Sequence, residues 1–536
     1  MRKHFLWVFA TFSFSGYSQI ITDTTKAAEN WFNLDPYTNK VNGVSTERTY
    51  NELLKGKKST TVIVGVIDSG VDFNHEDLKD VMWVNPKEIA GNGIDDDKNG
   101  YIDDIHGWNF LGGKDGKNVE KETLELTRVY RELKKKYEGK DEKTIASADK
   151  KEFELYTNAK TDFEKKLNEA QQELTQITFV NEMFTNLNLV VKDQLDVDSV
   201  KLQQLKQYKA RDKKEEGLVG YAQMILIKDT NLTVDYILKQ IDEAQDHFED
   251  QVKYNLNLEY DPRGIVGDDY KNSAEKFYGN SDCNGPNSLH GTHVAGIIGA
   301  NRINDKGVKG VADNVRIMSV RAVPDGDERD KDVANAIIYA VDNGAKVINM
   351  SFGKTYPYDK AAVDKAVKYA ESKDVLLIHA AGNDGVDVDK NIFYPCRKFV
   401  DGKKASNWVE VGALSWQQGT NLAASFSNYG KKTVDVFAPG VDIYSNKNLG
   451  GYLNESGTSM ASPVTAGVAA VIRSYYPNLT AKQVKKILEK SVDKDYKSQK
   501  VTKPGDKVAV KFSDLSVTGG VVNLYNAIIL AEKMSK

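Results

Sequence analysis

The run TVIVGVID, from Thr61 to Asp68, decides the fold class. It is apolar and rich in β-branched residues at successive positions, which indicates a strand buried on both faces. Similar runs recur further along the chain, namely VRIMSV from Val315, KVINMS from Lys346, VLLIHA from Val375, WVEVGAL from Trp408 and VDVFAPG from Val434. Helical patterns lie between several of them. The alternation predicts an α/β fold with a mostly parallel sheet and helices on both faces.

A long charged segment interrupts this alternation. Residues 118–262 are rich in Lys, Glu, Gln and Asp. Their apolar residues are spaced three and four apart, in one series at Phe163, Leu167, Ala170, Leu174 and Ile177 and in another at Ile237, Ile241, Ala244 and Phe248. Such seams predict two long helices packed on each other. We expect an α/β domain formed by residues 58–117 and 263–536, preceded by an extension (19–57) and interrupted by a helical insertion (118–262).

The first eighteen residues read as an export signal. A basic start precedes the apolar run from Phe5 to Phe14, and the small residues Gly16 and Ser18 follow it. This order is typical of a secretory signal peptide cut after Ser18. The run is too short to span a bilayer, and no other apolar stretch is long enough. We therefore expect an exported protein without a membrane span, either periplasmic or extracellular.

Charge and cysteine content narrow the partners and the chemistry. A net charge of −4 gives no electrostatic case for binding nucleic acid. Only two cysteines occur, Cys283 and Cys396, and the pattern of a two-cysteine metal site is absent. A disulfide and two free thiols are equally compatible with the sequence, because spacing alone does not fix the distance between the Cα atoms.

Polar residues follow the predicted strands and open two small-residue helices. Asp68 ends the first strand, while Ser351 and Asn383 follow VINM and VLLIHAAG. His290 opens the helix in NSLHGTHVAG, and Ser459 opens the one in NESGTSMASP. Singly, such residues are ordinary turn or capping residues. Together they point to one site, because the carboxyl ends of parallel strands share one edge of the sheet.

Three of these segments resemble a known family. VIDSGVD, HGTHVAG and GTSMASP resemble the signature segments of the subtilisin-like serine proteases (subtilases, peptidase family S8), in that family's order of Asp, His and Ser. INMSFG is similar to the family's substrate-binding strand, and AAGNDG to its oxyanion-hole segment. The similarity covers about residues 58–112 and 263–536. It implies a subtilisin-like three-layer fold interrupted by the helical insertion.

The resemblance also implies roles for individual residues. The nucleophile, base and orienting carboxylate would be Ser459, His290 and Asp68; the oxyanion donor would be Asn383; the substrate-binding residues would be Ser351, Phe352 and Gly353. The implied activity is that of an exported serine endopeptidase that hydrolyses polypeptides through an acyl-enzyme. Two alternatives stay open: an exopeptidase whose cleft the insertion restricts, and a catalytically silent binding protein on the same fold. The insertion could also bind a partner or be a solvated spacer.

The resemblance has departures. Asp68 and His290 lie 222 positions apart, because the insertion falls between them, whereas the family usually places them a few tens of residues apart. His379, which precedes AAGND, stands where a small residue is usual in the family, and it would narrow or polarise the substrate pocket.

A separate acidic loop suggests a metal. In GNGIDDDKNGYIDD, oxygen ligands stand at Asp95, Asp97 and Asn99, followed by Gly100, the carbonyl of Tyr101 and Asp103. This resembles the start of an EF-hand loop, although the twelfth position is His106 and not Glu, so that Asp103 or Asp104 would close the shell. We expect a structural calcium ion there and no organic cofactor; an ordinary solvated acidic turn is the alternative.

Overall fold

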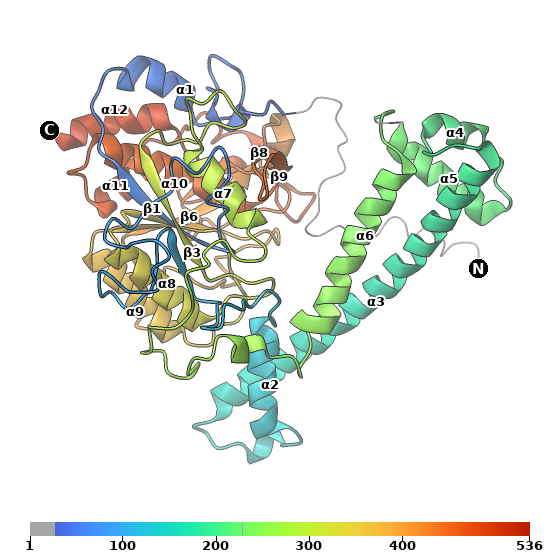
Figure 1. Cartoon of the computed structure of the whole chain (residues 1–536), viewed down its shortest axis with the longest axis horizontal. Helices are drawn as coiled ribbons and strands as arrows, with labels where there is room; N and C mark the ends of the chain where they lie inside the picture. Colours follow the sequence, from blue (N-terminus) through green and yellow to red (C-terminus); the bar gives the residue numbers. More distant parts are fainter. Residues whose placement is uncertain (1–26, 228) are drawn as a thin grey trace. The chain divides into compact units, whose positions relative to one another are not determined.

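The computed structural model describes residues 27–227 and 229–536 and divides the chain into two compact units (Figure 1). Of the described residues, one unit contains 27–120 and 262–536, and the other contains those within Lys121–Asp261. The sequence places these boundaries at residues 118 and 262. The predicted signal peptide, residues 1–18, lies outside the described residues.

The larger unit is built on a parallel sheet whose described strands run in the order β2-β3-β1-β4-β5-β6-β7. The strands are β1 (Val62–Asp68), β2 (Gly107–Asn109), β3 (Val315–Arg321), β4 (Val347–Met350), β5 (Leu376–Ala380), β6 (Trp408–Leu414) and β7 (Val436–Pro439). Every strand predicted from an apolar run is present, and all pair in parallel. Their carboxyl ends therefore lie along one edge.

Helices cover both faces of this sheet, which confirms the predicted α/β fold (Figure 1). Val64 and Val66 of β1 lie in the core shared with α7 (Leu289–Gly299) and α10 (Thr458–Tyr475). Ile67 lies in the opposite core, shared with α8 (Asp330–Asp342) and α9 (Lys360–Ser372). The remaining helices of this unit are α1 (Thr46–Thr49), α11 (Ala481–Lys490) and α12 (Leu524–Ser535). Because successive side chains of a strand point to opposite faces of the sheet, the apolar residues of β1 contribute to both cores.

The sequence did not predict the shortest strands. The edge strand β2 has three residues, GWN, and no apolar run announces it. Two antiparallel pairs were also missed, namely β8 (Ile443–Asn446) with β9 (Tyr452–Glu455) and β10 (Lys500–Thr502) with β11 (Ala509–Lys511). Strands this short carry too little periodicity to be recognised.

The N-terminal extension belongs to the same core. Trp31 and Phe32 are fully buried among the residues packed around α10. The backbone N–H of Leu524, at the start of α12, donates to the carbonyl of Val44. The described part of the extension is thus tied to the end of the chain.

The smaller unit is helical. Its helices are α2 (Glu125–Tyr137), α3 (Lys150–Leu195), α4 (Leu202–Gln207), α5 (Lys213–Leu226) and α6 (Val234–Asp250). The predicted seam is real, but α3 has two partners. Its first part packs on α2, where Phe163 lies 5.1 Å from the Tyr130 ring, and its last part packs on α6, where Asn188 donates to Asp235.

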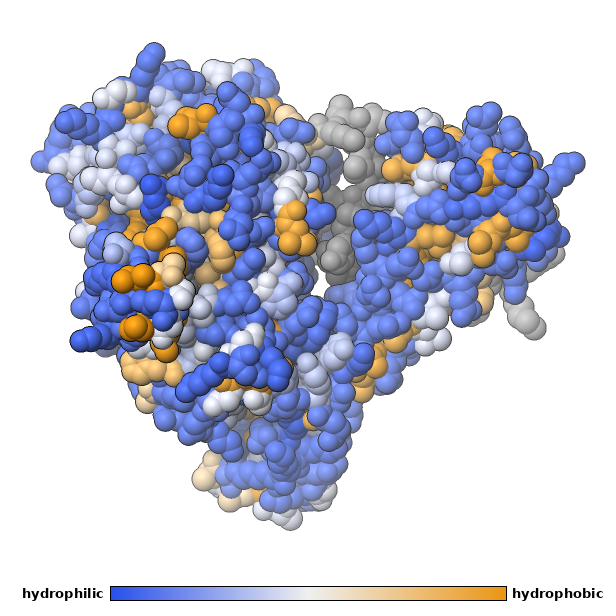
Figure 2. Space-filling model, in the orientation of Figure 1, coloured by the Kyte–Doolittle hydropathy of each residue, from blue (hydrophilic) through white to orange (hydrophobic). Residues whose placement is uncertain are grey.

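The described surface is largely polar. In the view of Figure 2, hydrophobic residues form small groups separated by hydrophilic ones. Over residues 27–227 and 229–536, every helix is too short or too polar to cross a bilayer.

Candidate active site

Asp68 and His290 meet at the carboxyl edge of the sheet. Asp68 is the last residue of β1 and is 1% exposed, whereas the His290 side chain, at the start of α7, is 41% exposed. Asp68 Oδ1 lies 2.7 Å from Nδ1 of His290 and also accepts from the backbone N–H of Ser69 at 2.7 Å. Because a carboxylate only accepts, Nδ1 carries the proton and Nε2 is left as a base.

Two glycines allow β1 and α7 to approach each other. Gly70 has φ +111, and a Cβ on it would lie 2.0 Å from the carbonyl oxygen of Asn284. A Cβ on Gly291 would lie 2.0 Å from the carbonyl oxygen of Gly70 and 3.2 Å from Cβ of Asp68. Any side chain at either position would push the histidine and the carboxylate apart.

Ser459 is the second residue of α10 and does not act as the helix cap. Gly457 occupies the N-cap position, without a capping side chain. The Ser459 hydroxyl instead donates a long bond of 3.3 Å to the carbonyl oxygen of Ser351, just beyond β4. Ser351 returns a bond of 2.9 Å from its own hydroxyl to the carbonyl of Ser459. That carbonyl needs a donor, because Pro463, four residues further on, has no N–H.

Asn383 is fixed by the residue before Ser459. Its Oδ1 accepts from both the backbone N–H and the hydroxyl of Thr458, each at 2.8 Å. Thr458 in turn accepts from the N–H of Gly382 at 3.1 Å. With its oxygen engaged, the exposed Asn383 presents its Nδ2–H₂ group as a donor beside the start of α10.

The segment Ser351–Gly353 continues β4 along the same edge. Ser351 is buried, Phe352 is half-buried and Gly353 is exposed. Behind it stands His379 of β5, whose Nδ1 lies 2.8 Å from Glu410 of β6. Asp68 thus ends β1, while Ser351 and Asn383 follow β4 and β5, and these three strands are neighbours in the sheet.

The two histidines of α7 have opposite electrostatic environments. Burial lowers the pKa of His290, but the charge and hydrogen bond of Asp68 outweigh it and raise that pKa above the ordinary value. Burial lowers the pKa of His293 to about 3, and its Nε2 lies 3.0 Å from the carbonyl oxygen of Ile443. His293 is therefore a neutral packing residue.

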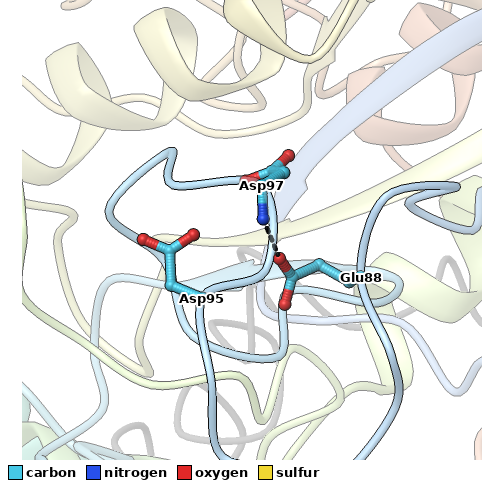
Figure 3. A group of neighbouring side chains, drawn as sticks. All are labelled: Glu88, Asp95 and Asp97. Carbon is cyan, nitrogen blue, oxygen red and sulfur yellow. Dashed lines mark hydrogen bonds between the residues drawn. The ribbon is translucent and has the colours of Figure 1, made fainter.

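The acidic loop gathers some of its predicted ligands. Carboxylate oxygens of Glu88, Asp95 and Asp97 lie within 4.8 Å of one another (Figure 3). The N–H of Asp97 donates to Glu88 at 3.1 Å, the bond drawn in Figure 3. Asn99 accepts from the N–H of Tyr101 at 2.8 Å. Three carboxylates form the hard oxygen donor set that calcium prefers.

Two other acids of this loop point elsewhere. The carboxylate of Asp103 accepts from the backbone N–H groups of residues 91–93. Asp104 is buried and accepts from Tyr339 and Asn85, and its burial raises its pKa to about 6. The carboxylate that joins Asp95 and Asp97 is that of Glu88, seven residues before Asp95, which the loop motif does not include, whereas Asp103 is not part of this group.

The two cysteines do not form a disulfide. Cys283 and Cys396 are both free thiols, and burial raises the pKa of Cys283 to about 12. This settles the question that the sequence left open.

The sequence did not predict the hydrogen bond from Ser351 to the carbonyl of Ser459, which Pro463 leaves without a helical donor. A proline at the sixth position of a helix is nevertheless a signal that can be read from the sequence.

Known proteins resemble this chain in sequence. The model of the subtilase family matches residues 59–509. The thermophilic serine proteinase of Bacillus sp. (strain AK1) is 42% identical over 206 residues, covering 38% of this chain and 47% of that protein. Subtilisin DY of Bacillus licheniformis is 38% identical over 223 residues, covering 41% and 74%. Thermitase of Thermoactinomyces vulgaris is 39% identical over 206 residues, covering 38% and 67%.

The aligned part spans about half of the Bacillus sp. proteinase and about three quarters of subtilisin DY. The family match covers most of this chain and includes β1, α7 and α10, the three elements that position Asp68, His290 and Ser459. By its parallel sheet, the segments at the edge of that sheet and the extent of the match, the chain belongs to the subtilase family.

Proposed function

We propose that this protein is an exported serine endopeptidase that hydrolyses peptide bonds in polypeptides. The observation that carries the proposal is the 2.7 Å hydrogen bond between Asp68 and His290, at the sheet edge where Ser459 and Asn383 also lie. Family membership supports it independently. A silent copy of the fold would have no use for a histidine polarised by Asp68 or for an asparagine anchored at the start of α10.

In this mechanism the Ser459 hydroxyl exchanges its long bond to Ser351 for one to Nε2 of His290. His290 takes the hydroxyl proton as Oγ attacks the scissile carbonyl carbon, and it gives that proton to the leaving amine. Asp68 keeps the ring in the required tautomer and stabilises the imidazolium. The Nδ2–H₂ of Asn383 and the N–H of Ser459 donate to the oxyanion. Water then hydrolyses the acyl-enzyme, with His290 again as base.

The test is labelling of the purified protein with a fluorophosphonate, read by peptide mass spectrometry. We expect the label on Ser459, and little label in a folded His290→Ala variant, because the hydroxyl is a weak nucleophile without its base. A folded parent that labels no more than a Ser459→Ala control would contradict the proposal. Products from a defined peptide then separate internal cleavage from removal of terminal residues.

We also propose that Glu88, Asp95 and Asp97 hold a structural calcium ion, with backbone carbonyls of the same loop completing the shell. Three carboxylates with oxygens within 4.8 Å of one another repel each other unless a cation lies between them. The ion would fix the loop before β2 and would take no part in hydrolysis.

Export rests on the basic and apolar pattern of residues 1–18. The measurement is N-terminal sequencing of the protein recovered from the periplasm and from the medium. A chain starting at Gln19 would agree with cleavage after Ser18. An uncut chain that stays inside the cell would contradict export.

A further inference from the structure

A buried histidine stands behind the substrate-binding segment Ser351–Gly353. His379 is 2% exposed and pairs through Nδ1 with Glu410 at 2.8 Å. Among the described residues its Nε2 is buried and has no hydrogen-bond partner. The register of β4 and β5 places His379 beside Met350, the residue before Ser351. The catalytic steps proposed above make no use of it.

The polar edge of His379 faces the inner side of the substrate-binding segment. A methyl group on Gly353 would lie 3.9 Å from both Nε2 and Cε1 of His379 and 3.3 Å from the carbonyl oxygen of Tyr394. Aromatic rings cover other sides of the imidazole, with the Phe352 centroid at 6.4 Å and the Trp408 centroid at 5.0 Å. Nε2 is thus aimed at the space beside Gly353.

The partners of Glu410 fix which tautomer His379 adopts. Glu410 accepts from Nε1–H of Trp408 at 2.8 Å, and its other oxygen faces Nδ1 of His379. A carboxylate offers no proton, so the neutral ring carries its hydrogen on Nδ1. Nε2 is then a buried lone pair. Such an acceptor is costly to leave without a donor.

We propose that His379 is a specificity-determining residue whose Nε2 accepts a hydrogen bond from the substrate side chain immediately N-terminal to the scissile bond. The enzyme then prefers side chains ending in an N–H or O–H donor, such as asparagine and glutamine, over apolar ones of the same shape. This inference rests on the proposed function, because it assigns the bound side chain to the pocket lined by Ser351–Gly353. An apolar side chain would leave Nε2 buried and unpaired.

The experiment compares kcat/KM for peptide amides that differ only at this position, as Asn against Leu and as Gln against Met. We expect the donor substrate of each pair to be favoured about tenfold, the typical effect of one buried unpaired acceptor. His379→Leu keeps a similar volume without the lone pair and should bring both ratios to one or below. His106→Leu is the matched control, since His106 bonds the carbonyl of Trp83 away from this segment, and it should keep the parental ratios.

Fluorophosphonate labelling of the same samples separates the two proposals. No label on Ser459 would overturn the proposed function. A labelled parent that cleaves Leu and Met substrates as well as Asn and Gln substrates would overturn the role of His379. Should His379→Leu fail to fold, the ratios of the parent enzyme decide alone. A purely structural histidine would change stability and leave the ratios near one in every variant.

Discussion

Replacing Ser351 by alanine should destabilise the start of α10 and lower activity. The Ser351 hydroxyl donates at 2.9 Å to the carbonyl of Ser459, which Pro463 leaves without its helical donor. The same hydroxyl accepts from Asn349 at 3.0 Å. Ser351 is 5% exposed, so water would not readily replace these bonds. One buried group without a partner costs about 1–3 kcal/mol, and we expect Ser351→Ala to lower the free energy of unfolding by about 2 kcal/mol.

The assay is urea unfolding of the Ser459→Ala protein, which cannot digest itself, followed by tryptophan fluorescence. A second substitution, Pro463→Ala, supplies an N–H four residues after position 459. In that background the same Ser351→Ala change should cost about 1 kcal/mol less, because the new N–H satisfies the carbonyl. Equal costs in the two backgrounds would refute the reasoning. In the active protein, kcat should fall with Ser351→Ala and recover in part with Pro463→Ala.

Four further predictions follow from the site. Burial lowers the pKa of His290 but Asp68 raises it by more, so the acid limb of kcat/KM should lie above the ordinary histidine pKa of about 6.5. Asp68→Asn should shift that limb to lower pH and reduce kcat by about 10⁴, the typical loss for this substitution in a catalytic triad; an unmoved limb would argue against the pair. Asn383→Ala should reduce kcat by about 10²–10³ with little change in KM, measured on one amide substrate. A chelator should lower the melting temperature of the parent and of an Asp115→Asn control but not of Asp97→Asn; equal shifts in all three would remove calcium from this loop. Deleting residues 121–261 should leave a folded protein that still labels, and an unfolded product would show that the larger unit depends on the insertion.

The sheet was predictable because its strands are buried on both faces. Runs such as the one ending at Asp68 are apolar on both faces, so their composition alone identifies them as buried strands. The edge strand β2 and the hairpin strands were not predicted, because their pairing partners and not their own residues determine that they form strands. The long helix α3 was predicted from its seam, but the seam does not say that α2 covers its first part.

The residues of the site that lie in short local motifs were predictable from the sequence. Asp68, His290 and Ser459 stand in short segments whose spacing is fixed locally by glycines and helix starts. Contacts between segments were not readable. The sequence around Asn383 does not indicate that Thr458 donates to its side-chain oxygen. The sequence around His379 likewise does not indicate its hydrogen bond with Glu410, which lies on the next strand. Such pairs depend on strand register, which emerges only when the sheet is assembled.

The large sequence gap between Asp68 and His290 is compatible with an undistorted site because each unit closes on itself. In the smaller unit the N–H of Leu124 donates to the carbonyl of Asn255, and Asn255 donates back to the carbonyl of Glu122. In the larger unit the ends of the interruption are anchored separately. The N–H of Asp325 donates to the carbonyl of Glu120, and Arg263 pairs with the buried Asp332 at 2.6 Å.

The hydrogen bonds that join the ends of the insertion reduce the entropic cost of placing it between β1 and α7. An open loop of this length would add to the entropy lost when β1 and α7 meet, although only logarithmically with length. A compact segment whose ends are bonded to each other behaves as a short connection. The constraint on the site then comes from Gly70 and Gly291, where any side chain would collide with backbone, and not from the number of residues between them.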